Sequence, residues 1–159
     1  MADHKNLEQA KSVFGTLCRA LDKHEWHYKK DEDKLSIECG ARGEDLPMEI
    51  TFKIDADRML AMLISHMPFV IHEDKRLDVA IAVTALNNRL VDGCFDYDIK
   101  SGHMFFRMTN SFIDSRLDEE VFAYMLFCAC KTIDDYNDKF LMLDKGMVSL
   151  EQFLSSLDN

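Results

Sequence analysis

The sequence predicts an α+β domain in which an antiparallel sheet is packed with helices, in the order α-β-β-β-β-α-β-β-α-α. Three stretches carry apolar residues at helical spacing: residues 5–23, 77–91 and 119–143. Three others alternate apolar with polar residues: residues 34–40, 48–54 and 94–109. A chain of 159 residues is expected to form one domain, residues 1–159, with a core of its own.

The first helix and three strands follow from these patterns. In residues 5–23 one row of side chains is expected to face the core: Leu7, Ala10, Val13, Phe14, Leu17 and Leu21. Strands are predicted at residues 26–30 and 34–40, where Leu35, Ile37 and Cys39 share one face. After the GARGED loop, residues 48–54 alternate as a third strand, and Asp55 suits the first position of the next turn.

The fourth strand, residues 59–64, is apolar on both faces. Pairing Ile54 with Met59 sets Phe52 opposite Ala61 on the core face. It leaves three apolar side chains, Leu60, Met62 and Ile64, beside Lys53, Thr51 and Glu49. Such a row indicates a surface covered by another part of the chain or a docking site. Internal cover fits a monomer, whereas a partner is the better interpretation if helices occupy only one face.

The next helix carries two apolar stripes. One contains Leu77, Ile81, Ala85 and Asn88, and the other contains Val79, Val83, Leu86 and Leu90. A surface that broad is expected to be buried on both sides. Asp92-Gly93 is expected to end this helix, since glycine accepts the left-handed backbone of a helix end.

A hairpin with a Ser101-Gly102 turn is predicted to follow. The pairing that keeps its apolar residues together sets Ile99 across from Met104, Phe95 across from Met108 and Tyr97 across from Phe106. The same register sets Asp96 across from Arg107 on the other face, where opposite charges attract.

Two helices complete the chain. Residues 119–143 form a long helix with Asp118 as N-cap and a core stripe of Val121, Met125, Cys128, Thr132, Tyr136 and Phe140. Gly146 ends it. Ser149 and Gln152 have the spacing of a capping box, which opens a short helix through Leu157.

The helix-to-hairpin segment resembles the signature of a known family. The residues that carry the likeness are Leu86, Asn87, Gly93, Phe95, Asp98, Gly102, Phe106 and Arg107. The family is the YbjN group of bacterial proteins, described as sensory transduction regulators, and the resemblance spans roughly residues 26–154. It implies a fold like that of type III secretion chaperones. One departure is His72, which stands where the family is expected to have a proline before the helix.

Composition restricts the compartment and the partners. The net charge of −10 repels phosphate backbones and anionic membranes, so neither nucleic acid nor a membrane is an expected partner. The charged start of the chain does not resemble a signal peptide, and no apolar run approaches the roughly 20 residues that span a bilayer. A cytoplasmic protein is expected. Five cysteines without C-x-x-C spacing are interpreted as reduced thiols.

Candidate chemical sites are weak, so no catalytic residue, metal site or cofactor is predicted. Asp96, Asp98 and Gly102 resemble a calcium loop only faintly, because Arg107 replaces the bidentate glutamate. Solvent-exposed or structural roles are the better interpretation for three other sets of residues: Cys94 with His103, His24 with His27, and Asp134 with Asp135 and Asp138.

The function predicted from the sequence is a non-enzymatic, cytoplasmic protein-interaction module of the YbjN type, acting as a homodimer with a further protein client. The expected contact residues are Leu60, Met62, Ile64 and Phe105. Two alternatives stay open. One is a type III secretion chaperone that binds an effector segment, and the other is an enzyme with an unrecognised pocket.

Overall fold

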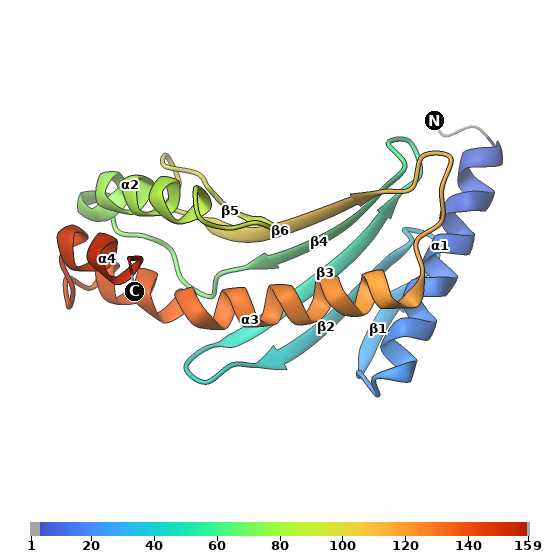
Figure 1. Ribbon diagram of the computed structural model, residues 1–159, viewed down its shortest axis with the longest axis horizontal. Helices are drawn as coiled ribbons and strands as arrows, with labels where there is room; N and C mark the ends of the chain where they lie inside the picture. The colour runs from blue at the N-terminus through green and yellow to red at the C-terminus, as the bar shows by residue number, and fades with distance from the viewer. Residues whose placement is uncertain (1–3, 159) are drawn as a thin grey trace.

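The computed structural model describes residues 4–158 and contains one six-stranded antiparallel sheet of order β1-β2-β3-β4-β6-β5 (Figure 1). The elements are α1 (His4–Lys23), β1 (Tyr28–Asp31), β2 (Ser36–Arg42), β3 (Pro47–Asp55), β4 (Leu60–His66), the 3₁₀ turn η1 (Glu73–Lys75), α2 (Arg76–Asn87), β5 (Cys94–Tyr97), β6 (Met104–Ser111), α3 (Glu119–Asp144) and α4 (Leu150–Ser156). The predicted fold class and element order are confirmed.

Helices α1 and α3 contact each other and cover one face of the sheet, which we call the inner face (Figure 1). Along β3 and β4 every second side chain is buried there, and in β3 Met48, Ile50, Phe52 and Ile54 alternate with more exposed residues. Helix α2 lies beside the edge strand β5, and α4 packs on α2 and α3. The opposite face of the sheet is called the outer face.

Helix α1 buries most of the row predicted for it, and Ala20 joins that row. Leu7 is 37% exposed, so its predicted burial is wrong. The first turns of α1 lie at the rim of the domain beside the β6–α3 connection, where Gln9 donates to the carbonyls of Phe112 and Ser115 (both 2.8 Å).

The pairing of β3 with β4 differs by two residues from the prediction. Ile54 pairs with Ala61 and Phe52 with Leu63, so Met59 is not the partner of Ile54. The cause is the turn: the Asp55 carboxylate accepts from the Arg58 backbone N–H (2.9 Å), and Met59 follows with φ of 56° as part of the turn. A shift of two keeps every side chain on its predicted face.

The β5–β6 hairpin shows the same kind of shift. Phe95 pairs with Phe106 and Tyr97 with Met104, whereas the predicted partners were Met108 and Phe106. Ile99 was predicted to pair with Met104, but it lies in the turn and is 45% exposed. The turn is wider than expected because the carboxylate of Asp98 accepts from the Lys100 N–H (3.0 Å) and from the Ser101 hydroxyl (2.7 Å).

Helix α2 corrects two expectations. It ends at Asn87, well before Asp92 and Gly93, and Gly93 (φ 74°) instead passes so close to Phe106 that a Cβ there would lie 2.4 Å from the ring. Only one apolar stripe is buried, with Val79, Ala82, Val83 and Leu86 in the core. Leu77 and Ile81 are 67% and 44% exposed and Asn88 is also exposed, because α2 lies at the edge of the sheet and turns one face to it.

The last two helices begin where predicted and end within one residue of the prediction. Asp118 caps α3 by accepting from Val121 N–H (3.0 Å), Gly146 follows its end, and Ser149 and Gln152 form the capping box of α4. The buried stripe of α3 is rotated from the prediction. Its core residues are Phe122, Ala123, Met125, Leu126, Ala129, Ile133, Asn137, Phe140, Leu143 and Asp144, while Val121, Cys128, Thr132 and Tyr136 are half-buried at its margin.

Candidate protein-interaction surface

The four residues predicted to contact a partner lie together on the outer face. Leu60, Met62 and Ile64 alternate along β4 and point away from the helices, and Phe105 lies on β6 next to them. We call these four side chains the outer apolar row. All four are half-buried, yet none of them packs against the hydrophobic core. Within residues 4–158, helices α1 and α3 lie on the opposite face of the sheet and do not cover them.

Polar residues border this row on both neighbouring strands. On β3, Asp55, Lys53 and Thr51 pair with Leu60, Met62 and Ile64. On β6 the partners are Ser111, Thr109 and Arg107. An apolar centre with a polar rim is the usual anatomy of a protein–protein contact.

Phe105 closes one end of the row. It pairs with His66 across the strands, and their ring centroids are 5.3 Å apart. Next to it, Arg107 donates from Nε to Asp96 Oδ2 (2.6 Å) and from a second nitrogen to Asp96 Oδ1 (3.2 Å). The predicted Asp96–Arg107 pair therefore exists, although the two residues contact diagonally and not directly across. The Asp96 carboxylate also raises the pKa of Arg107, because it stabilises the charged guanidinium.

A second exposed apolar group escaped the sequence analysis. Leu77 and Ile81 lie one helical turn apart on the water-facing side of α2, in a stripe that was predicted to be buried. Their spacing carried the signal of a stripe, but the pattern alone does not say which stripe of a two-sided helix faces the sheet.

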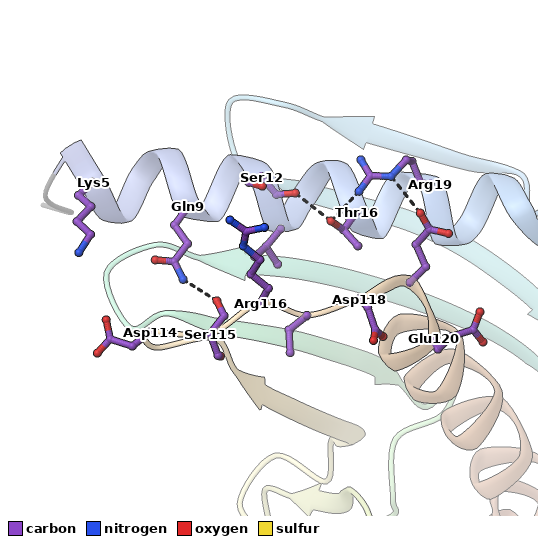
Figure 2. Close-up of a pocket in the computed structure, with 13 residues that line it drawn as sticks. Lys5, Gln9, Ser12, Thr16, Arg19, Asp114, Ser115, Arg116, Asp118 and Glu120 are labelled. Carbon is purple, nitrogen blue, oxygen red and sulfur yellow. Dashed lines mark hydrogen bonds and ion pairs between the residues drawn. The ribbon is translucent and has the colours of Figure 1, made fainter.

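A groove of about 1040 Å³ lies between α1 and the β6–α3 connection (Figure 2). Mostly polar side chains line it, and several of them form hydrogen bonds across the groove. Arg19 donates to Glu119 (3.1 Å) and to the Thr16 hydroxyl (3.0 Å), and Gln9 holds the connection at the other end. These contacts join α1 to the start of α3, so we interpret the groove as the boundary between two packed elements and not as a binding site.

The weak chemical candidates have structural roles or stay apart. Asp98 forms the hairpin turn, and Asp134 accepts from the Glu44 backbone N–H (2.9 Å). Asp135 pairs with Lys131 (3.0 Å). Within residues 4–158, no three histidine, cysteine, aspartate or glutamate side chains are placed to hold a metal ion.

Two other thiols have raised pKa values, the buried Cys39 and the half-buried Cys130. Burial raises the pKa of Cys39 to about 12 and that of Cys130 to about 11, since a thiolate is disfavoured in an apolar surrounding. Such thiols are poor nucleophiles at neutral pH. In the described part of the chain, no helix is both long and apolar enough to cross a membrane.

The sheet with helices on its inner face places the chain in a structural class, the type III secretion chaperone fold. The HopA1–SchA chaperone–effector complex contains a chain with a TM-score of 0.54 and 16% identity, over 87% of this chain and 99% of that one. The ExsC–ExsE complex contains another, with a TM-score of 0.56 and 13% identity, over 80% of this chain and 94% of that one.

Within that class, the chain belongs to the YbjN family, whose model matches residues 15–142 and is described as "Putative bacterial sensory transduction regulator". The crystal structure of E. coli YbjN, described as "a putative transcription regulator", is also similar, with a TM-score of 0.56 and 11% identity over 77% of this chain and 86% of that one. A search of curated proteins found no match. The predicted family is thus confirmed, and the solved structures support the fold.

Proposed function

We propose that this chain is a cytoplasmic protein-binding module that acts through the outer apolar row and carries out no chemistry of its own. The observation that supports the proposal is the position of Leu60, Met62, Ile64 and Phe105 on the face opposite the helices, without core contacts. Apolar side chains gathered in this way lose unfavourable contact with water when another protein covers them.

The partner we propose first is a second copy of the chain. In a two-fold contact each row lies on the other, so the apolar centre covers itself and the polar rims meet at its border. Two chains that each carry a net charge of −10 repel one another. Salt screens this repulsion, and the dimer should therefore tighten as ionic strength rises.

A client segment is the second proposed occupant. Support comes from the likeness to the chain in the HopA1–SchA complex, which is a chaperone–effector complex. The YbjN family is described as a sensory transduction regulator, and a regulator of this kind would also act by binding another macromolecule. For the alternative of an enzyme with an unrecognised pocket, no observation provides specific support.

The test is Met62→Asp, which places a charge in the middle of the row. The variant should keep the circular dichroism spectrum of the wild type, while light scattering shows half the wild-type mass. Met147→Asp is the matched control, because Met147 is 70% exposed and lies between α3 and α4. It should leave the mass unchanged. If light scattering shows that the wild-type chain has the mass of a monomer, the dimer proposal is wrong.

The client proposal has a separate readout. A photo-crosslinking residue placed at position 62 should capture a specific protein in the native cytoplasm, and the same residue at position 147 should not. Equal capture at both positions would count against a client on the outer face.

A further inference from the structure

A hollow of about 600 Å³ lies on the other side of the sheet, where the β2–β3 loop meets α3. Two aromatic side chains line it, Trp26 ahead of β1 and Phe127 on α3. Their ring centroids are 6.5 Å apart, and Phe127 is 48% exposed. Phe127 also contacts His24, with ring centroids 5.2 Å apart, and the rest of its half-exposed ring borders the concave site, where a ligand can reach it.

The loop that forms the opposite wall is held in place. The backbone N–H of Glu44 donates to Asp134 Oδ1 (2.9 Å), and Gly43 approaches the same carboxylate so closely that a Cβ there would lie 2.1 Å from it. The Gly43 N–H also donates to the carbonyl of Leu46 (3.2 Å). A fixed wall keeps the hollow open without requiring the loop to be ordered by the ligand.

The lining of the hollow is acidic. Its carboxylates are Glu44, Asp45, Asp134, Asp135 and Asp138, and its basic residues are Arg42, Lys131 and Lys139. Two of those cations are engaged within α3: Lys131 with Asp135 (3.0 Å), and Lys139 over the ring of Tyr136 (4.8 Å). Carboxylates thus outnumber cations around an exposed aromatic wall, which favours a cationic ligand.

We propose that this hollow binds an arginine side chain from a partner protein. A guanidinium is flat, weakly hydrated and always charged, so it stacks on an aromatic ring while its N–H groups reach a carboxylate in two-pronged geometry. Lysine presents a compact, strongly hydrated charge that stacks less well. Trp26 and Phe127 supply the rings, and Asp138 and Asp45 supply carboxylates at the rim.

The experiment uses the fluorescence of Trp26, the only tryptophan of the chain. The full chain is titrated with a short glycine–serine peptide that carries a central arginine pair. Matched peptides carry lysine, or the neutral arginine analogue citrulline. The arginine peptide should give a saturable change in Trp26 emission that weakens with salt. The lysine peptide should bind more weakly, and the citrulline peptide should give no saturable change.

Two aromatic variants separate the hollow from the rest of the helix. Phe127→Ala should weaken binding of the arginine peptide about fivefold, the size of an exposed cation–π contact. Tyr124→Ala is the control, because Tyr124 is 53% exposed on the same helix but does not line the hollow. The affinity of Tyr124→Ala for the arginine peptide should stay within about twofold of the wild-type value, since this substitution removes no cation–π contact with the peptide. Asp138→Asn should weaken binding and flatten its salt dependence.

The inference is overturned if the citrulline peptide binds as well as the arginine peptide, or if Phe127→Ala and Tyr124→Ala behave alike. It does not depend on the outer apolar row. Met62→Asp should leave the fluorescence titration unchanged, so failure of the proposed function and failure of the arginine site give different results.

Discussion

His72 contacts the buried carboxylate of Asp144 twice. Its backbone N–H donates to Oδ1 (2.7 Å), and its ring Nδ1 lies 2.8 Å from Oδ2. The Asp144 side chain is only 1% exposed, and Lys145 Nζ is 3.8 Å from the same Oδ2. The pair joins the segment after β4 to the last residue of α3. The position that departs from the expected family pattern is therefore one that anchors two distant elements.

The first prediction compares two substitutions of His72. Its φ of −63° and ψ of 148° suit a proline, so His72→Pro introduces little backbone strain at this residue. Both variants lose the contact between the imidazole ring and Asp144. Only His72→Pro also loses the backbone N–H that donates a hydrogen bond to Asp144. His72→Pro should be less stable than His72→Ala by about 1 to 3 kcal/mol, the value of a hydrogen bond to a charged, buried group.

Urea unfolding of the two variants measures that difference. Asp144→Asn serves as a further control, since it keeps an oxygen acceptor for the backbone N–H while removing the charge. If the proline variant matched or exceeded the alanine variant in stability, the backbone contact would contribute nothing to the fold.

The faces of the strands could be predicted from the sequence, but the register could not. Alternation has a period of two, so Leu60, Met62 and Ile64 were placed on the correct side of β4 even though their partners were displaced. The displacement arose in the turns. Met59 adopts a positive φ, and the Asp98 side chain accepts hydrogen bonds within the hairpin turn. The spacing of apolar residues reveals neither feature.

Features made by distant segments were beyond the sequence. Trp26 and Phe127 line the same hollow because the segment after the C-terminal end of α1 lies beside the middle of α3. The exposure of Leu77 was missed because a helix at the edge of a sheet buries less of its surface than one lying across it. In both cases the missing information is tertiary placement rather than local propensity.

A second prediction concerns Asn87, which acts as one more strand residue at the β5 edge. Its side-chain amide donates to the Phe95 carbonyl (2.8 Å) and its oxygen accepts from the Phe95 N–H (2.9 Å). Asn87→Asp keeps the acceptor but sets a carboxylate against the Phe95 carbonyl. It should cost at least as much stability as Asn87→Ala, about 1 to 3 kcal/mol.

Amide hydrogen exchange at Phe95 reports on this contact directly. Exchange should accelerate in Asn87→Ala, because the Phe95 N–H at the edge strand loses the Asn87 acceptor. Unaltered exchange at Phe95 would show that the edge is protected by α2 without the amide.

The third prediction tests the inner face of the hairpin. Phe106 is fully buried and its ring lies 5.1 Å from that of Phe95. Phe106→Ala should open a cavity and cost about 3 to 5 kcal/mol of unfolding free energy. Phe105→Ala is the matched control one residue away on the outer face, and thermal unfolding should show a much smaller loss. A similar loss in both would mean that Phe105 packs in the core as well.

The final prediction concerns two thiols with raised pKa values, the buried Cys39 and the half-buried Cys130. Cys39 is 9% exposed, and burial lifts its pKa from 9.0 to about 12, while Cys130 rises to about 11. At pH 8 both thiols should react with a thiol reagent far more slowly in the folded chain than in denaturant, because reaction needs the thiolate. Rapid labelling of Cys39 in the folded chain would contradict its burial.

The raised pKa values of Cys39 and Cys130 also make the stability of the fold depend on pH. The unfolded chain releases these protons near pH 9 and the folded chain only nearer 11 to 12, so stability is full below about pH 9 and falls as pH rises through that window. Urea unfolding of the wild type and of Cys39→Ala across this range measures the effect, and the variant should lose less stability than the wild type between pH 9 and 11.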